Sequence, residues 1–317
     1  MTGARQDGDD GLRLEVGAPA MGPAAVIDRP GIPDRSTFHA GGRVGFLLIH
    51  GLGGTPVEMR YVAQGLARAG YTVHCCQLAG HCGSVEELRT STPEQWSASV
   101  EAAHDRLKDH CDVVIAGGLS MGAILAAQLA QTRPDGIQAL AFYAPTLWLN
   151  GWSMPWHSRI LRYVRPTRFN IKMTLPEHEP YGLKDERIRA MVVHSMQNKD
   201  SSEAGVFCTP VRCFSHFNAL CDQVKPKLKD IKVPSLILHP REDDIADIDN
   251  AFFLQRNLGG RVEMVVLDDS YHIITLDKQR QLVVDRSVAF GETIARLNAE
   301  RLAPAVSSTH ETVTAAE

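Results

Sequence analysis

The chain has 317 residues, of which 44% are hydrophobic and 22% charged, so it is long enough for one large α/β domain or two ordinary ones. This composition is typical of a soluble globular protein and excludes a fibrous or mainly disordered chain. The 33 Lys+Arg against 37 Asp+Glu give a formal net charge of −4 without a clustered basic run, which argues against a nucleic-acid partner.

The ends of the chain and its cysteines bear on its location. No run of about 18 apolar residues occurs, so no membrane-spanning helix is expected. The opening MTGARQDGDDG has three acidic residues and lacks the apolar segment of a secretory signal. Seven cysteines at irregular spacing favour reduced thiols over a disulfide framework. We therefore expect a cytoplasmic location.

Strand-like and helix-like segments alternate along the chain after an arm, residues 1–40, that is predicted to be poorly ordered. Nearly continuous apolar strands that alternate with helices predict an α/β fold, a doubly wound, mostly parallel sheet covered on both faces. The predicted strands are Val44–Ile49, Thr72–Cys76, Val113–Ala116, Leu140–Tyr143, Val233–Leu238 and Val262–Leu267, and the clearest helices are Pro56–Ala69, Pro93–Lys108 and Gly122–Gln131.

The alternation stops between residues 146 and 230, where the pattern is helical and no convincing core strand occurs. We interpret this stretch as a helical cap inserted into a core of residues 41–145 and 231–302, and residues 303–317 as a disordered tail. Three of the four tryptophans lie near Met154 in the cap, and they either pack the cap or line an apolar pocket. These tryptophans are Trp148, Trp152 and Trp156.

A candidate nucleophile stands in VVIAGGLSMGAILAAQLA, residues 113–130. A β-branched strand runs into Gly118-Leu119-Ser120-Met121-Gly122, and a helix of small and apolar residues follows at once. This is GxSxG in the strand-turn-helix context that exposes a serine at a helix N-terminus, where the helix dipole favours developing negative charge. We therefore predict that Ser120 is a nucleophile for acyl transfer.

A second signal is the Gly-rich loop in FLLIHGLGGTP, residues 46–56, which leaves the end of a strand. Such a loop can bring a backbone N–H next to the nucleophile, and two such donors make an oxyanion hole. We assign these donors to Leu52 and Met121. His50 precedes the loop, and we interpret it as a structural histidine that pins the loop rather than as the base.

The base and the acid are expected on loops after later strands, in the order serine, acid, histidine. The last strand is followed by His272, which is the predicted base; His239 and His216 are weaker rivals because neither lies on that loop. The strand before it is followed by REDDIADID. The acid stays open among three residues of that loop, with Asp243 favoured over Asp244 and Asp247.

His74-Cys75-Cys76 and His81-Cys82 suggest a metal site at first sight. Adjacent residues of a strand point to opposite faces, so Cys75 and Cys76 cannot easily bind one ion. We interpret these cysteines as core residues, and we expect neither a metal nor an organic cofactor.

The chain resembles the α/β-hydrolase superfamily, and within it the bacterial carboxylesterases and monoacylglycerol lipases with a small helical cap. The resemblance rests on IHGLGGTP, QLAGHCGSVEELRTSTPEQW, GLSMG, PREDDIAD and SYHIITLDKQRQLVVDRSVAFGETI, and it extends over about residues 44–297. The sequence departs from the family pattern at Cys82, where family members often have Gly, and in its long terminal arms.

The resemblance implies Ser120, Asp243 and His272 as the catalytic triad, with the Leu52 and Met121 amides as oxyanion donors. It also implies a small-molecule ester of short to medium acyl chain as the substrate. A thioesterase, an amidase or a carbon–carbon hydrolase would use the same triad, and a non-catalytic ligand receptor is a further alternative. Because the cap residues are apolar, Trp152 is expected to influence the preferred acyl length.

Overall fold

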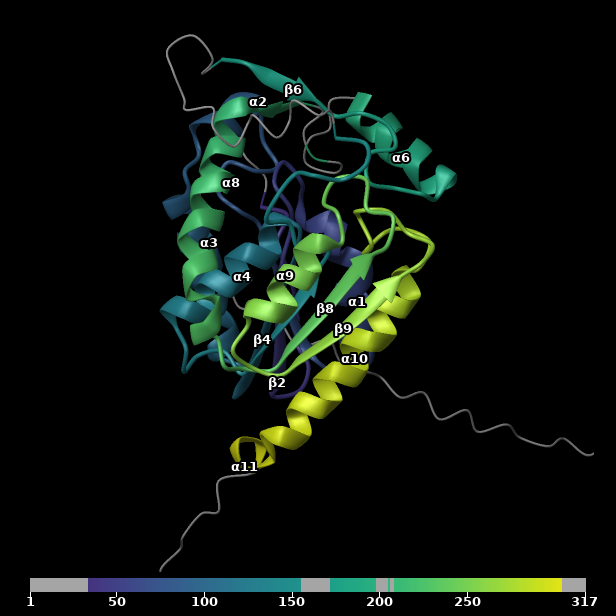
Figure 1. Ribbon diagram of the computed structural model, residues 1–317. Helices are drawn as coiled ribbons and strands as arrows, with labels where there is room; N and C mark the ends of the chain where they lie inside the picture. Colours follow the sequence, from purple (N-terminus) through teal and green to yellow (C-terminus); the bar gives the residue numbers. More distant parts are fainter. Residues whose placement is uncertain (1–33, 155–171, 198–204, 206–207, 304–317) are drawn as a thin grey trace, which may run out of the picture. The chain divides into compact units, whose positions relative to one another are not determined.

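The computed structural model of the chain describes residues 34–154, 172–197, 205 and 208–303 (Figure 1). The predicted arm up to residue 33, and all of the predicted tail except Ala303, lie outside these residues. Trp156 does too.

A seven-stranded sheet forms the centre of the described part, in the order β1-β3-β2-β4-β5-β8-β9. Six of its strands run parallel, namely β3, β2, β4, β5, β8 and β9, and β1 pairs antiparallel with β3 at one edge. A separate two-stranded antiparallel sheet joins β6 and β7. The strands are β1 (Thr37–His39), β2 (Val44–Ile49), β3 (Thr72–Cys76), β4 (Val113–Leu119), β5 (Ala139–Tyr143), β6 (Thr174–Pro176), β7 (Cys208–Pro210), β8 (Ser235–Pro240) and β9 (Val262–Leu267).

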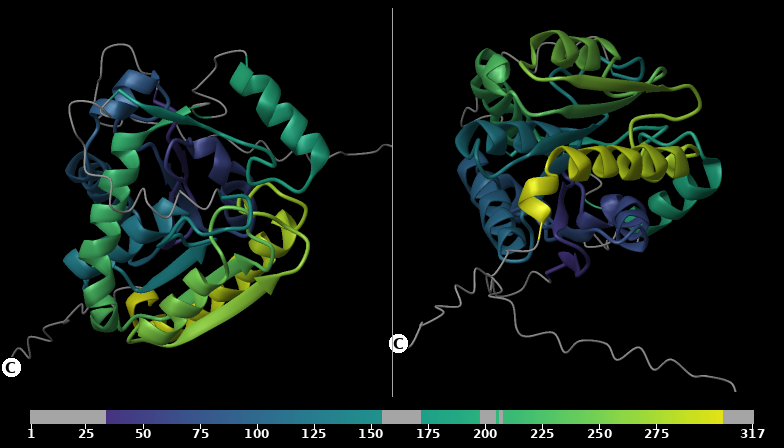
Figure 2. Two further views of the ribbon diagram at one scale, coloured as in Figure 1. Left: turned by 45° about the horizontal axis from the view of Figure 1, so that its top comes forward. Right: turned by 90° about the horizontal axis from the view of Figure 1, so that it is seen from below.

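Helices cover both faces of the seven-stranded sheet, which confirms the predicted doubly wound α/β fold. Figures 1 and 2 show α3, α4, α8 and α9 on one side of the sheet and α1 and α10 on the other. The helices are η1 (Pro56–Met59), α1 (Arg60–Arg68), α2 (Val85–Thr90), α3 (Pro93–Lys108), α4 (Met121–Thr132), α6 (Glu186–Gln197), α8 (Val211–Val224), η2 (Lys225–Asp230), α9 (Asp249–Asn257), α10 (Arg280–Leu297) and α11 (Ala299–Leu302).

The central strands are mostly apolar because each supplies side chains to two cores. In β2, Phe46 and Leu48 pack into the core under α1 and α10, whereas Leu47 and Ile49 pack into the core under α3, α4 and α8. Successive side chains of a strand point to opposite faces, so a strand that is buried on both faces reads as a continuous apolar run.

Capping residues explain why α3 begins where the sequence predicts. The Thr92 side chain accepts the Gln95 N–H, the Gln95 side chain accepts the Thr92 N–H, and Pro93 occupies the first helical turn. This reciprocal arrangement satisfies N–H groups that a helix start leaves without partners. The predicted range of α3 therefore agrees with the structure.

The structure differs from the predicted arm at its end. Residues 37–39, which were assigned to the poorly ordered arm, form β1 and pair with β3. A three-residue strand is too short to show a period in the sequence, and it exists here because β3 presents a free edge.

The predicted helical cap also differs from the structure in two respects. It contains the strands β6 and β7 as well as helix α6. Helix α8 packs against the sheet-covering helices: Phe217, Leu220 and Cys221 belong to the same core as α4. The boundary predicted at residue 230 therefore falls after a helix of the core layer. We use "inserted segment" below for residues 146–210.

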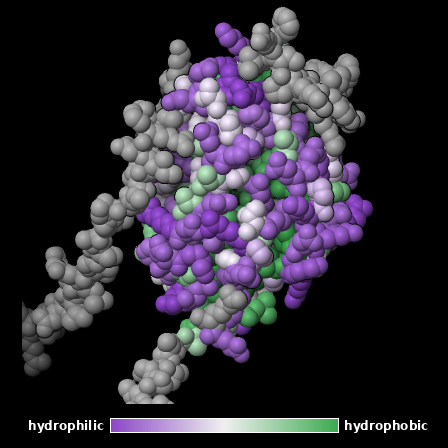
Figure 3. Space-filling view, turned by 90° about the vertical axis from the view of Figure 1, so that its left-hand side faces the viewer, coloured by the Kyte–Doolittle hydropathy of each residue, from purple (hydrophilic) through white to green (hydrophobic). Residues whose placement is uncertain are grey.

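Exposed apolar side chains are scattered over the described surface. Figure 3 looks onto the side with α3 and α8 and shows mostly hydrophilic residues with a narrow, interrupted band of hydrophobic ones. The large hydrophobic side chains most exposed among the described residues are Trp152, Met173, Met191 and Leu297. In the described part of the chain, no helix has the length and apolar character needed to cross a membrane.

The strand order places a crevice at one end of the sheet. After β2, the chain forms β3 on one side of β2 and then β4 on the other side. The direction in which strands are added to the sheet therefore reverses at β2. At such a reversal the loops that follow the two strands diverge, and ligands of open α/β sheets bind there. The loop after β2 begins at His50, and the loop after β4 begins at Ser120.

Candidate active site

Ser120 occupies a tight turn between β4 and α4. Its φ of 57° and ψ of −115° lie outside the regions that residues with side chains ordinarily adopt. The Ser120 N–H donates to the carbonyl of Tyr143 on β5 at 2.9 Å, which ties the turn to the neighbouring strand. The side chain is thereby held above the end of the sheet at the N-terminus of α4.

The glycines on either side of Ser120 are required by close packing. A Cβ on Gly118 would collide with the backbone of Gly122, and a Cβ on Gly122 would collide with the carbonyl of Ile49. The backbones of β2, β4 and α4 therefore meet at this turn with no room for side chains. This contact explains the spacing of the GxSxG motif.

The loop after β2 is held by His50, as predicted. The carbonyl of Gly51 lies 2.9 Å from His50 Nδ1 and accepts the N–H of Gly54 at 3.3 Å. The other ring nitrogen of His50 accepts the N–H of Leu78 at 3.1 Å, so Nδ1 carries the proton. The Gly51 carbonyl and the Leu52 N–H belong to the same trans peptide and point in opposite directions. Because the carbonyl points toward His50, the Leu52 N–H points away from it.

His272 is linked to one of the three candidate acids. His272 Nδ1 lies 3.0 and 2.9 Å from the two carboxylate oxygens of Asp243, and both residues are buried. Asp243 Oδ1 also accepts the N–H groups of Ile245 and Ala246 at 2.9 and 2.8 Å. Burial alone would raise the pKa of Asp243, but His272 and the other partners outweigh it and hold this pKa below its usual range.

Asp244 and Asp247 have other contacts. Asp244 is buried, and its two oxygens accept the backbone N–H groups of His272 at 3.1 Å and Gly182 at 3.0 Å. It therefore connects the His272 loop to the inserted segment. Asp247 accepts the N–H of Asp249 at 2.9 Å, at the start of α9.

The rival histidines are placed differently. His239 is buried with Nε2 2.8 Å from the carbonyl of Ala246, and burial lowers its pKa. His216 lies on α8, where Arg212 Nε is 3.4 Å from its Nε2. Neither belongs to the residues that line the pocket next to Ser120, whereas His272 does.

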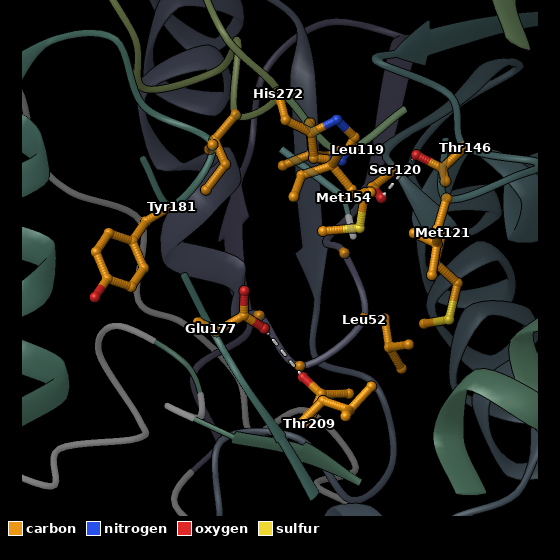
Figure 4. A pocket seen from close by; sticks show the side chains of 18 of the residues that line it. Leu52, Leu119, Ser120, Met121, Thr146, Met154, Glu177, Tyr181, Thr209 and His272 are labelled. Atoms are coloured by element: carbon orange, nitrogen blue, oxygen red, sulfur yellow. Dashed lines mark hydrogen bonds between the residues drawn. The ribbon is translucent and has the colours of Figure 1, made fainter. Parts of the chain in front are cut away.

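The hydroxyl of Ser120 has a partner that the sequence did not predict. Its Oγ lies 3.1 Å from Oγ1 of Thr146, a buried residue just after β5 (Figure 4). His272 Nε2 is buried and has no hydrogen-bond partner in the described part of the chain. Figure 4 shows the His272 ring next to Ser120, as transfer of the hydroxyl proton to this nitrogen requires.

A pocket of about 250 Å³ opens at Ser120. Figure 4 shows Leu52 and Met121 on one side of it and Glu177 and Tyr181 on the other. Most of its lining is apolar, as is usual for small-molecule sites. The apolar residues that line it are Leu52, Leu119, Met121, Leu149, Met154, Leu175, Pro176, Phe214, Phe217, Ile245 and Ile273.

The tryptophans of the inserted segment pack elsewhere. Trp148 contacts the ring of Phe253, and Trp152 is 59% exposed with its indole N–H donated to the carbonyl of Glu242 at 3.0 Å. Of the group around them, Met154 lines the pocket. Trp152 therefore does not belong to the lining through which it was expected to influence the preferred acyl length, because its ring packs against Tyr271.

Two partly buried carboxyl groups in the pocket were not predicted from the sequence. Glu58, on η1, and Glu177, just after β6, both line the pocket, and the Thr209 hydroxyl donates to Glu177 Oε1 at 3.2 Å. Burial raises the pKa of Glu58 to about 7 and also raises that of Glu177. An acidic residue between two apolar ones in PVEM is the only sequence signal for Glu58, and it does not distinguish a buried carboxyl from a surface one.

The cysteines of β3 are core residues, as predicted. Cys75 packs into the core under α1 and α10, and Cys76 into the core under α3 and α4. Within the described ranges, no three His, Cys, Asp or Glu side chains are grouped so as to hold a metal ion. Cys82 has a φ of 65°, in the left-handed region, which accounts for the glycine that the family pattern has at this position.

Known proteins resemble the chain over most of its length. The family model described as serine aminopeptidase, S33, matches residues 43–279. A thermostable monoacylglycerol lipase of Bacillus sp. (strain H-257) is 31% identical over 267 residues, covering 82% of this chain and 96% of that protein. A carboxylesterase of Bacillus subtilis (strain 168) is 25% identical over 253 residues, covering 79% and 93%. A solved structure from work on the metagenome-derived lipolytic enzymes LipS and LipT is 29% identical with a TM-score of 0.69, covering 81% of this chain and 97% of that one.

Proposed function

The chain belongs to the serine aminopeptidase family S33 of hydrolases, and on this basis we propose that it cleaves carboxylic esters through an acyl-enzyme on Ser120. The observation that carries the proposal is the position of His272. One ring nitrogen faces the buried Asp243, and the other is unpaired among the described residues, next to Ser120. This is the arrangement that a general base between an acid and a nucleophile requires.

In the proposed reaction, Ser120 Oγ attacks the ester carbonyl carbon while His272 Nε2 accepts the hydroxyl proton. The N–H groups of Leu52 and Met121 stabilise the negative charge on the carbonyl oxygen. His272 returns the proton to the leaving alcohol. A water molecule then attacks the acyl carbon while His272 accepts a proton from it, and the acid is released as this proton returns to Ser120 Oγ. Asp243 keeps the proton on Nδ1 of His272 and stabilises the imidazolium. No step of this proposal uses a metal or an organic cofactor.

The pocket supports a neutral substrate with an apolar acyl chain. The described residues that line it include no lysine or arginine, and they include the carboxyl groups of Glu58 and Glu177. An anionic leaving group such as coenzyme A would meet no positive side chain there, whereas alcohol hydroxyls could donate to a carboxylate. We therefore propose short to medium acyl esters of neutral alcohols, including monoacylglycerols.

A panel of substrates tests this proposal. Purified protein should react covalently with a fluorophosphonate probe and should hydrolyse p-nitrophenyl esters and monoacylglycerols with kcat/KM above that for acyl-CoA, an anilide or a carbon–carbon substrate. A protein that does not react with the probe would favour the receptor alternative. Faster turnover of a thioester or an amide would assign a different bond to the same triad.

We expect Phe214→Ala to shift the preferred acyl chain to longer esters. Phe214 lines the pocket, so its removal lengthens the space for the chain, and each further buried CH₂ contributes about 0.8 kcal/mol, or roughly fourfold in kcat/KM. Trp152→Ala is the matched control, since the Trp152 ring lies outside the pocket lining. Profiles of kcat/KM against chain length check this, and an unchanged optimum in Phe214→Ala would show that the acyl chain lies elsewhere.

The pH dependence of kcat/KM should have an acid limb above the ordinary histidine value of about 6.5. Burial disfavours the charged ring of His272, but Asp243, Asp244 and Glu58 outweigh it and raise its pKa. A general base must be neutral, so activity should be lost as the pH falls through this raised pKa. A limb well below pH 6 in a pH profile of the wild type would contradict the assignment of His272 as the base.

The location and the division into domains stay part of the proposal. All seven cysteines are free thiols, and six of them are buried, which suits the reducing cytoplasm. We also propose that the inserted segment caps the pocket, because Met154, Leu175, Glu177 and Tyr181 line it from above the sheet.

A further inference from the structure

Glu58 is a partly buried carboxyl in the pocket lining that the proposed mechanism does not use. Its Oε2 accepts the N–H of Gly51 at 3.1 Å, at the start of the loop that bears the Leu52 amide. A Cβ on Gly54 would collide with this carboxyl, so the loop from Gly51 to Gly54 folds directly against it. The Glu58 side chain therefore forms the support of the predicted oxyanion loop.

The charged and titratable groups that face Glu58 come from three other parts of the fold. They are His272 after β9 and Glu177 just after β6, which line the same pocket as Glu58, and Cys82 after β3. Partial enclosure of a carboxyl without a paired cation has a cost in free energy, and a neutral side chain of similar shape would avoid it. Glu58 lines the same pocket as His272, where a negative charge favours the protonated imidazole.

We propose that Glu58 is a positioning residue for ester hydrolysis: it orients the oxyanion loop through the Gly51 N–H, and its charge stabilises protonated His272 during turnover. This inference rests on the proposed function. The hydrogen bond acts on the loop in either charge state, because a carboxyl accepts in both. The electrostatic effect exists only when Glu58 is ionised.

The sign of the electrostatic effect follows from the charges. Burial raises the pKa of Glu58 to about 7, so the group gains its charge as the pH rises through neutrality. The ionised carboxylate favours imidazolium and thus raises the pKa of His272. Removing the charge should therefore move the acid limb of kcat/KM to lower pH.

Three variants test the proposal. Glu58→Gln keeps an oxygen acceptor for Gly51 but removes the charge; Glu58→Ala removes both. Glu263→Gln makes the same charge change at an exposed position of β9, at the end of the sheet away from the site. For each variant, kcat, KM, the pH profile of kcat/KM and the melting temperature are measured with one p-nitrophenyl ester.

Glu58→Gln should shift the acid limb down by about one pH unit with kcat within about fivefold of the wild type. Glu58→Ala should also lower kcat by about 10- to 100-fold with little change in KM, because a displaced oxyanion donor weakens transition-state binding more than substrate binding. Glu263→Gln should do neither. A wild-type acid limb in Glu58→Gln would overturn the electrostatic role, and wild-type kcat in Glu58→Ala would overturn the positioning role.

These failures differ from a failure of the proposed function. If the wild type does not react with the fluorophosphonate probe, the esterase proposal fails before any Glu58 variant is compared. If the wild type reacts and Glu58→Gln keeps its pH profile, the inference about Glu58 fails alone. Should Glu58→Ala not fold, the pH profile of Glu58→Gln still decides the electrostatic role.

Discussion

Replacing Ser120 with alanine should lower kcat for every ester by at least about 10⁴-fold and abolish labelling by the fluorophosphonate probe. The reason is that the proposed covalent intermediate has no other attachment point. The lost hydroxyl contacts Thr146 at 3.1 Å and has no further hydrogen bond among the described residues, so folding should change little. Turnover of p-nitrophenyl esters, mass spectrometry of the labelled protein and the melting temperature measure these effects.

Ser97→Ala provides the matched control for Ser120→Ala. Ser97 lies on α3, with its hydroxyl bonded to Pro93 and Gln128, away from the pocket. This variant should retain activity within about twofold and should still react with the probe. Turnover near the wild-type rate in a folded Ser120→Ala protein would contradict the acyl-enzyme mechanism as a whole.

Asp243→Asn should lower kcat by roughly 10⁴-fold. An asparagine amide that faces His272 Nδ1 can donate a hydrogen bond, which favours the tautomer with the proton on Nε2. That tautomer cannot accept the proton of Ser120. The loss should persist across the pH range in which the wild type is active, because the low pKa of Asp243 keeps this carboxylate charged there.

Asp244→Asn and Asp247→Asn separate the three acids of the loop. Asp244 accepts the N–H groups of His272 and Gly182, and an amide can keep one of these bonds, so we expect a loss below about 30-fold. Asp247 contacts the start of α9, and its variant should stay within about twofold. If Asp247→Asn were the most damaging of the three, the contact between Asp243 and His272 would not be the one that orients the base.

Local pattern in the sequence was sufficient for the parallel strands of the sheet and for the turn at Ser120. The β-branched run before GLSMG predicts a strand, and the small residues after it predict a helix. The glycines leave space for the close backbone contacts of the turn between them. The position of a strand buried on both faces is likewise predictable, because most of its residues are apolar, although β4 extends to Leu119 rather than to the predicted Ala116. The order of serine, acid and histidine along the chain followed from the parallel topology.

The choice among Asp243, Asp244 and Asp247 was not available from the sequence. All three lie within seven residues of the end of β8, and only the fold decides which carboxylate meets the imidazole and which meets backbone amides. The same is true of Trp152, because a helical or turn pattern does not reveal which face a side chain takes when its neighbours are distant in the chain.

By itself, then, the sequence determined the doubly wound sheet, the turn at Ser120 and the loop with His50, because these depend on neighbours within a few residues. Tertiary structure decided the acid facing His272, the lining of the pocket and the partial burial of Glu58 and Glu177. These depend on segments up to about two hundred residues apart that meet at the pocket, as those of Glu58 and His272 do. A carboxyl group looks the same in sequence whether it is solvated or enclosed, and its charge and role differ because enclosure changes its electrostatic surroundings.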